Sequence, residues 1–469
     1  MRQLSGLDSA FIYMEGEGKY NHLTSVYLYD QSTVKRGVLR FKRILDHIES
    51  RLSRSPVFRQ KLYQVPFSVD YPYWVDDASF DIEFHVRHIA LPKPGDWRQF
   101  CIQAARIHSR PLDMSRPAWE MYVVEGLDNI KNLPKGSFAI IAKYHHAAID
   151  GSTAIDLLGA LHDLDPAAPS STSEEDWRPR ALPGPVALFS RVLYNNVRQP
   201  FRLARSLAVT FPTLGRMALS YRSGNEGAAT SVPQTRFNGK VSPHRVFDGH
   251  QFKLATFKKI KEQVPGVTVN DVVLAVVSGA LRRFLLQQQE LPDQSLVALV
   301  PISTRSASQR DPGNQVTLMS CSLVTDEPDP RERLRRISDI TRASKVTMDA
   351  VSARQMTELQ HNIPSVTLAL AGRLVNGMGL GARTRLSNAV ITNVPGPQQP
   401  LYFCGARLLS IWGCGPVIDG VGLLVLASSY NGTLCLSLSS CRGMLPDIGN
   451  LAGYLDAACD ELLAAFKLE

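Results

Sequence analysis

An apolar run that ends in two histidines and a tight turn constrains this fold most. Residues 137–146 read SFAIIAKYHH, which is typical of a buried strand. Gly151 then permits a sharp turn, and STAIDLLGALHDL at 152–164 has the pattern of a helix. The stretch HHAAIDG at 145–151 is therefore expected to lie at the end of a strand and to lead into a helix.

The two histidines are not expected to bind one metal ion, because adjacent side chains of a strand point to opposite faces. No other cluster in the sequence has the spacing of metal ligands. Either His145 and His146 are both satisfied, partly buried side chains, or one faces a cleft as a general base and its neighbours fix the backbone and the tautomer. The pattern favours the second reading. Asp150 is expected to contact an imidazole or to pair with an arginine from elsewhere.

A covalent nucleophile is not indicated. The sequence contains no G-x-S-x-G motif, and GEGKY at 16–20 is not a phosphate-binding loop. A histidine base without a nucleophilic partner fits direct transfer, in which a bound alcohol or amine attacks.

The chain of 469 residues is long enough for two domains. A segment rich in proline, serine and alanine at 165–185 marks a boundary. We predict an α/β protein with an N-terminal domain at 1–165, a linker with an arginine-rich helical segment at 166–244, and a C-terminal domain at 245–469. Strands are predicted at 22–30, 80–92, 295–304, 388–397, 420–432 and 434–440, a buried helix at 268–288, and a closing amphipathic helix at 448–466.

The cellular location is constrained by three features. Seven cysteines without a C-x-x-C pair favour a reducing compartment. The first residues do not resemble a signal peptide, and no stretch of about 18 residues is apolar enough to span a membrane. An intracellular protein, soluble or peripheral on a membrane, is expected.

The net charge of +9 is concentrated in the linker. Between Asp176 and Glu226 there are eight arginines and no acidic residue, with Phe, Leu and Tyr interleaved. A cationic amphipathic segment of this kind can lie at an anionic membrane surface. A solvated helix that packs one face on the protein is an equally good reading, and nucleic acid ranks well behind both because no nucleic-acid module is recognisable.

The motif H-H-x-x-x-D-G resembles the signature of the CoA-dependent acyltransferase superfamily. Other segments narrow the resemblance to the bacterial wax ester synthase/diacylglycerol acyltransferase family. These segments are LSGLDSAF (4–11), HVRHIALPKPG (85–95), RPAWEMYVVEGL (116–127), VNDVVLAVVSGALR (269–282), VPISTR, GNQV and NVPGP. Ala118 departs from the leucine usual in the third of them. The resemblance runs from near residue 4 to at least residue 432.

This resemblance implies two domains of the chloramphenicol acetyltransferase type with a tunnel between them. Acyl-CoA would enter from one side and a long-chain alcohol or diacylglycerol from the other. No cofactor is implied, because acyl-CoA is a substrate. The implied location is cytoplasmic and peripheral, on the inner membrane face or on lipid inclusions.

The resemblance also assigns roles to residues. His146 is implied as the general base, and Asp150 as a structural residue whose partner is expected to be Arg305. Asn270 is expected either to donate to the oxyanion or to cap the helix that begins nearby. Trp119 is interpreted as a packing residue beside the substrate channel. Pro395 and Gly396 are expected to shape a turn near that channel.

Two rivals to this function stay open from the sequence. One is a condensation-type acyltransferase that takes acyl groups from a carrier domain. The other is a lipid-binding surface protein without catalysis. The absence of a carrier domain in this sequence argues against the first, and the intact H-H-x-x-x-D-G motif argues against the second.

Overall fold

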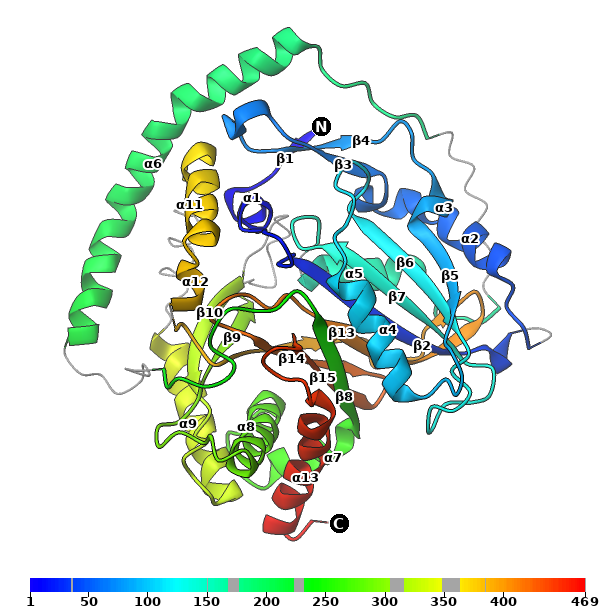
Figure 1. Ribbon diagram of the computed structural model, residues 1–469, viewed down its shortest axis with the longest axis vertical. Helices are drawn as coiled ribbons and strands as arrows, with labels where there is room; N and C mark the ends of the chain where they lie inside the picture. Colours follow the sequence, from blue (N-terminus) through cyan, green and yellow to red (C-terminus); the bar gives the residue numbers. More distant parts are fainter. Residues whose placement is uncertain are drawn as a thin grey trace.

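The computed structural model describes residues 1–34, 37–149, 151–167, 177–222, 232–303, 316–347, 363–383 and 385–468 (Figure 1). Two six-stranded sheets form its centre. The strands of the first, in spatial order, are β12 (Tyr402–Phe403), β13 (Ala406–Cys414), β2 (His22–Asp30), β7 (Phe138–His145), β6 (Trp119–Glu125) and β5 (Val86–Ala90). Those of the second are β10 (Val316–Ser322), β9 (Val297–Ser303), β11 (Ala389–Pro395), β14 (Leu423–Tyr430), β15 (Thr433–Cys441) and β8 (Arg245–Lys253).

Helices and a small third sheet surround these two sheets. The small sheet consists of β1 (Arg2–Gln3), β4 (Tyr73–Asp76) and β3 (Gln60–Tyr63). The helices are α1 (Gly6–Tyr13), α2 (Phe41–Glu49), α3 (Ile82–His85), α4 (Trp97–Ser109), α5 (Gly151–Leu161), α6 (Pro185–Arg222), α7 (Leu254–Glu262), α8 (Val269–Gln287), α9 (Pro330–Thr347), α11 (Ser365–Gly377), α12 (Leu380–Arg383) and α13 (Ile448–Ala465). The predicted α/β class with two domains is confirmed.

The first sheet contains strands from both ends of the chain. β13 pairs antiparallel with β2, from Arg407 opposite Asp30 to Cys414 opposite Thr24. β13 also contacts the second sheet, because Ser428 Oγ of β14 donates to the Ile411 carbonyl of β13 at 2.5 Å. The domain boundaries at 165 and 244 stay a prediction. Strand pairing joins the two predicted domains, because β12 and β13 lie within 245–469 and β13 pairs with β2.

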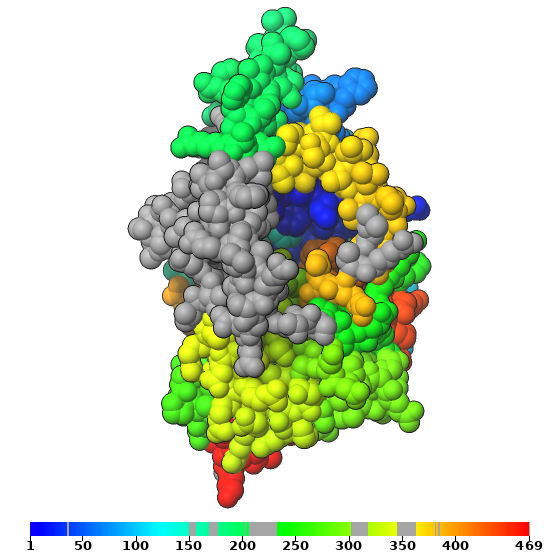
Figure 2. All heavy atoms as spheres, turned by 90° about the vertical axis from the view of Figure 1, so that its left-hand side faces the viewer, coloured from blue at the N-terminus to red at the C-terminus, as the bar shows by residue number. Residues whose placement is uncertain are grey.

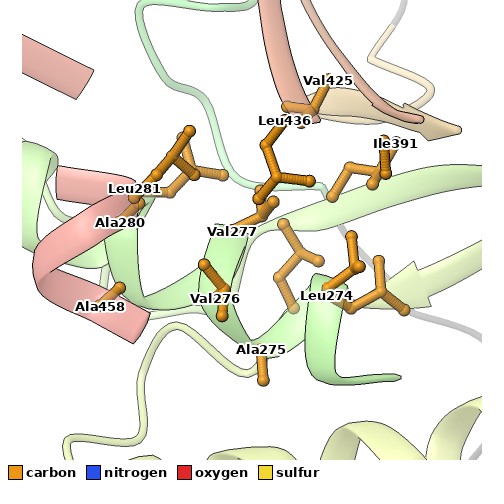
Figure 3. Packing of buried hydrophobic residues seen from close by; sticks show 14 of the residues in the cluster. Leu274, Ala275, Val276, Val277, Ala280, Leu281, Ile391, Val425, Leu436 and Ala458 are labelled. Atoms are coloured by element: carbon orange, nitrogen blue, oxygen red, sulfur yellow. The ribbon is translucent and has the colours of Figure 1, made fainter. Parts of the chain in front are cut away.

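Helix α8 forms the centre of the second core, as its apolar composition predicts. Thirteen of its residues are buried. Figure 3 shows side chains of α8 directed at Ile391, Val425 and Leu436 of the sheet, with Ala458 of α13 on another side. A Cβ added at Gly279 would lie 3.0 Å from the Cβ of Ala458, so the glycine permits the close approach of the two helices.

The strand predicted at 80–92 is wrong in its first half. Residues 82–85 form the short helix α3, and β5 begins only at Val86. Asp81 explains the difference, because its carboxylate accepts a hydrogen bond from the Glu83 N–H at 3.0 Å and caps the turn. An N-cap of this kind offers the backbone a local partner that competes with strand pairing.

Candidate active site

The two histidines lie at the end of β7, as predicted, and their environments differ. His145 is the last residue of the strand and its side chain is fully buried. His146 follows in a turn and is half-buried. The backbone N–H of His146 donates to the Asn21 carbonyl at 2.8 Å, which fixes the chain at the start of this turn.

Both ring nitrogens of His145 have partners. Nε2 lies 3.1 Å from Oε1 of Glu15, and Nδ1 accepts the N–H of Ala147 at 3.1 Å. An Nδ1 that accepts leaves the proton on Nε2, from where it is donated to the carboxylate. Glu15 Oε1 also accepts the Asn21 N–H at 2.6 Å, so one carboxylate holds both His145 and the segment that anchors His146.

The imidazole of His146 is held by an aromatic ring. Phe11 of α1 stacks on it with a centroid separation of 4.0 Å and an interplanar angle of 18°. Such stacking restricts rotation of the imidazole. The sequence analysis missed Phe11 and Glu15 as site residues. Phe11 ends the LSGLDSAF segment and Glu15 follows it closely, so their place beside this motif was the only available signal.

A hollow opens beside these N-terminal residues. Figure 2 shows it on the face that carries α11, with dark-blue N-terminal residues at its floor and α11 on its rim. α11 is fixed to the N-terminal segment by Asn376, whose Nδ2 donates to the carbonyls of Met14 and Glu15 at 3.0 and 3.1 Å. The opening is thus framed by the segment that positions His145.

A buried lysine stands behind the histidine pair. Lys143 Nζ donates to the carbonyls of Ile107 and Arg110 at 3.2 and 3.1 Å and lies 3.5 Å from Oε2 of Glu120. Burial lowers the pKa of Lys143 to about 8. The lysine joins the last turn of α4 to β7 and so fixes the strand that delivers the histidines.

The asparagine of the N-D motif is not the helix cap. Thr268 caps α8, and Asp271 completes the capping box, because its Oδ2 accepts from the Thr268 N–H at 2.8 Å. Asp271 Oδ1 also accepts from Thr341 Oγ1 at 2.8 Å. The capping reading of Asn270 is therefore wrong. Its Oδ1 accepts instead from Asn393 Nδ2 at 3.4 Å, which joins the N-D and NVPGP segments.

This division of roles gives a testable difference. Replacing Asp271 with alanine is expected to lower the free energy of unfolding by about 1 to 3 kcal/mol, because the capping box is lost and the buried Thr341 hydroxyl keeps only the Ser338 carbonyl as an acceptor. Urea unfolding at neutral pH measures the change. Asn270→Ala is the matched control and should cost less than about 1 kcal/mol. A larger loss for Asn270→Ala than for Asp271→Ala would contradict the assignment.

The remaining predicted residues lie in several places. Trp119 is fully buried in the core, stacks on His85 and donates from Nε1 to the Phe58 carbonyl at 3.0 Å. Its predicted packing role is confirmed, and its place beside a substrate channel stays a prediction. Pro395 is exposed, and Gly396 donates its N–H to the Ser429 carbonyl at 2.9 Å. Gly151 begins α5. Asp150 and Arg305 lie outside the described residues, so their pairing stays a prediction.

Within the described ranges, no group of three His, Cys, Asp or Glu side chains could hold a metal ion. No described helix is long and apolar enough to cross a membrane.

The two six-stranded sheets and the histidines at the end of β7 agree with the two-domain fold that the sequence predicts. The chain matches the model of the wax ester synthase/diacylglycerol acyltransferase catalytic domain at residues 4–273 and that of the C-terminal domain at 312–463. It belongs to the wax ester synthase/diacylglycerol acyltransferase family.

Individual relatives agree with this membership. A Mycobacterium tuberculosis protein named as a diacylglycerol O-acyltransferase is 35% identical to this chain, with 99% of this chain and 90% of the relative covered. The O-acyltransferase WSD of Acinetobacter baylyi is 30% identical, with 97% and 96% covered.

Solved structures show the same fold. The wax ester synthase/diacylglycerol acyltransferase of Marinobacter aquaeolei has a TM-score of 0.69 at 26% identity, with 99% of this chain and 100% of that chain covered. The starter condensation domain of rhizomide synthetase has a TM-score of 0.52 at 11% identity, with 99% and 94% covered, which is a likeness of fold alone.

Proposed function

We propose that this enzyme transfers a long-chain acyl group from acyl-CoA to a long-chain alcohol or to diacylglycerol, with His146 as the general base. Neutral His146 accepts the hydroxyl proton while the alcohol oxygen attacks the thioester carbonyl. The tetrahedral intermediate then expels the CoA thiolate, which takes the proton back from the imidazolium. The side-chain amide of Asn270 is the proposed donor to the oxyanion.

The observation that carries this proposal is the contrast between the two imidazoles. His145 is fully buried and both its nitrogens are engaged, which suits a residue that fixes the backbone. His146 is half-buried and held by ring stacking on Phe11, which suits a residue that exchanges a proton with a bound substrate.

Direct transfer without an acyl-enzyme is supported by the state of the cysteines. All seven are free and buried. Burial raises the pKa of six of them, Cys101, Cys321, Cys404, Cys414, Cys435 and Cys459. A thiol in such surroundings is a poor source of the thiolate nucleophile. The proposed reaction uses neither a metal nor a cofactor beyond its acyl-CoA substrate.

The product profile tests the reaction directly. Purified protein is incubated with palmitoyl-CoA and, in separate reactions, with long-chain alcohols or diacylglycerols. Formation of wax ester or triacylglycerol with release of free CoA is expected. Absence of both esters would refute the proposal, and ester formation from a carrier-loaded acyl donor alone would favour condensation-type chemistry.

We further propose that the enzyme works at a lipid surface, peripheral to the inner membrane or to lipid inclusions, where its acceptor is dissolved. Helix α6 supports this because a stripe of its apolar side chains faces outward. Six apolar residues with the spacing of one helical stripe are exposed, Val186, Phe189, Leu193, Tyr194, Val197 and Phe201. The half-buried side of α6 carries three further apolar residues, Leu188, Val192 and Leu203, together with amides. Asn195 donates to Asp70 Oδ2 at 2.8 Å, and Asn196 donates to the Val69 carbonyl at 2.9 Å.

Further exposed apolar residues lie on α11, which borders the hollow of Figure 2. On α11, Val366, Leu370 and Leu374 are exposed at intervals of four residues, and Met378 follows in the same register. Phe67, in the turn at 66–68, is 93% exposed. Exposed apolar residues in this arrangement support docking on lipid with the opening toward the acceptor.

Charge should strengthen this docking. Arg191, Arg198 and Arg205 are exposed on α6, and each arginine that reaches an anionic surface adds at most about 1 kcal/mol. Changing all three to glutamate is expected to reduce co-sedimentation with anionic liposomes at least tenfold. High salt should weaken wild-type binding, because the Debye length falls from about 10 Å at 0.1 M to about 3 Å at 1 M.

The control for this experiment keeps the charge. Phe189, Leu193 and Phe201 changed to serine should weaken binding to zwitterionic liposomes as well, because apolar burial is lost. If both variants sedimented like the wild type on anionic liposomes, α6 would not be the docking element.

A further inference from the structure

A basic cavity lies at the seam between the two domains, away from the histidines. Its volume is about 500 Å³, and it is lined by one face of α4, the start of β8 and the first turn of α13. Its basic residues are Arg98, Arg106, His244, Arg245 and Arg442, and its acidic residues are Asp248 and Asp447.

The cavity has an excess of positive charge that the protein does not neutralise. Among the described residues, no carboxylate forms an ion pair with Arg98, Arg106 or Arg442. Asp248 accepts hydrogen bonds from Trp97 Nε1 and from the Gly249 N–H, both at 2.8 Å, and burial raises its pKa. Both hydrogen bonds are made by Oδ1, whereas Oδ2 lies beside Gly449 at the start of α13, and Asp248 forms no ion pair with the described arginines of the cavity.

The start of α13 adds backbone N–H groups to the same cavity, and among them the Asn450 N–H donates to the Asp447 carbonyl at 3.0 Å. α13 is 18 residues long, its N-cap residue Asp447 makes no side-chain capping bond, and no acid lies in its first turn. The first N–H groups of a helix have no intrahelical acceptor and favour an anion. Ile448, Gly449 and Asn450 line the cavity together with the arginines, so side-chain charge and helix terminus converge.

A hydrogen bond links the cavity to the segment beside the active site. Arg245 is buried, and its Nη2 donates to the Gly18 carbonyl at 2.8 Å. Gly18 belongs to the segment from Met14 to Asn21, in which Glu15 bonds to His145 and Asn21 to His146. A ligand held at Arg245 thus lies one short segment away from the histidines, as a substrate with a long flexible arm requires.

We propose that this cavity binds the phosphate groups at the nucleotide end of acyl-CoA, an inference that rests on the proposed function. The diphosphate and the ribose phosphate can accept charge-assisted hydrogen bonds from the several cationic groups of the cavity. Ile102, which is 40% exposed, and Val246 supply apolar surface for a purine. The pantetheine arm then runs along the 14–21 segment toward His146.

The first test measures binding without catalysis. Adenosine 3′,5′-bisphosphate, which carries the ribose phosphate and one adjoining phosphate of CoA, is titrated calorimetrically into the full chain. Arg98→Glu and Arg442→Glu should each weaken its binding about tenfold or more, since tenfold corresponds to about 1.4 kcal/mol. Arg40→Glu makes the same charge change on an exposed residue outside the cavity and should leave binding unaltered. Equal affinity in all four proteins would overturn the proposal.

A second experiment distinguishes a lipid headgroup from CoA as the source of the phosphate. Phosphatidate vesicles should bind the wild type and both cavity variants alike. Loss of vesicle binding with unchanged bisphosphate affinity would mean that a lipid headgroup is the ligand.

A third experiment distinguishes this inference from the proposed function. In turnover, the ratio of kcat/KM for palmitoyl-CoA to that for S-palmitoyl-pantetheine should fall about tenfold or more in the variants. An unchanged ratio would overturn the inference. If the wild type used neither donor, the proposed function would fail, while the titration would still decide the role of the cavity.

Discussion

Replacing His146 with alanine is expected to reduce the rate of ester formation by about 10²- to 10⁴-fold, the usual contribution of a general base. The half-buried imidazole at the end of β7 is the proposed proton acceptor, and alanine has none. Single-turnover measurement of CoA release from palmitoyl-CoA with hexadecanol reports the chemical step. Thermal unfolding should change little, because the side chain of His146 lies at the edge of the core and not within it.

His145→Ala is the matched control and should show the opposite pattern. It removes the partner of Glu15 and of the Ala147 N–H in a fully buried place, so a stability loss of about 1 to 3 kcal/mol is expected. Its effect on the chemical step should be smaller than that of His146→Ala. Near-normal turnover in His146→Ala, or a greater loss of rate in a stable His145→Ala protein, would reverse the roles of the two histidines.

Local patterns predicted the elements that carry these histidines. The alternating HLTSVYLYD segment became β2 with the predicted bounds, and the apolar run before the histidines became β7. The apolar stretch from 268 to 288 became the buried helix α8. Each of these elements is decided mainly by its own side chains, because an apolar pattern of that length has few alternatives to burial.

Contacts between distant segments could not be predicted. Nothing within 406–414 indicates that this strand joins β2, almost 400 residues earlier in the chain, because pairing depends on the tertiary arrangement. Glu15 likewise carries no local signal that its carboxylate bonds to His145. Of the two alternatives for Asn270, the capping one is wrong because Thr268, two residues earlier, supplies the cap with Asp271.

The orientation of α6 shows the same limit. The sequence predicted an amphipathic helix, and amphipathic helices usually turn their apolar face to the protein. In this protein the half-buried side of α6 combines Leu188, Val192 and Leu203 with hydrogen-bonding amides, and a second apolar stripe faces outward. Only the positions of their partners, Asp70 and Val69, decide which face is inside.

The fold should lose much of its stability between pH 6.5 and pH 5, because several histidines, among them His47, His108 and His162, are buried in the neutral form. Burial is the main cause that lowers the pKa of His47 and of His162 to about 4 and that of His108 to about 3, all from an ordinary value of 6.5. All three are held as neutral tautomers, with His162 Nδ1 donating to the Leu158 carbonyl and Nε2 facing the Tyr29 hydroxyl.

The sign follows from proton uptake on unfolding. Above pH 6.5 these histidines are neutral in both states and stability does not depend on them. As pH falls below 6.5, the histidines of the unfolded chain bind protons while those of the folded chain stay neutral, so the free energy of unfolding falls. The fall continues until the folded pKa values near 4 and 3 are reached. At pH 5 the loss is about 2 kcal/mol for each histidine, and about 6 kcal/mol for three is a large part of an ordinary folding free energy.

Urea unfolding followed at pH 7.5, 6.5, 5.5 and 5.0 measures this loss. His162→Gln offers the matched control, because glutamine can donate to Leu158 and accept from Tyr29 but does not titrate. The variant should lose about 2 kcal/mol less than the wild type between pH 7.5 and pH 5, whatever its stability at neutral pH. A wild-type free energy of unfolding that stays constant over this range would show that the buried histidines are protonated at no cost to the fold. A His162→Gln curve parallel to that of the wild type would show the same for His162.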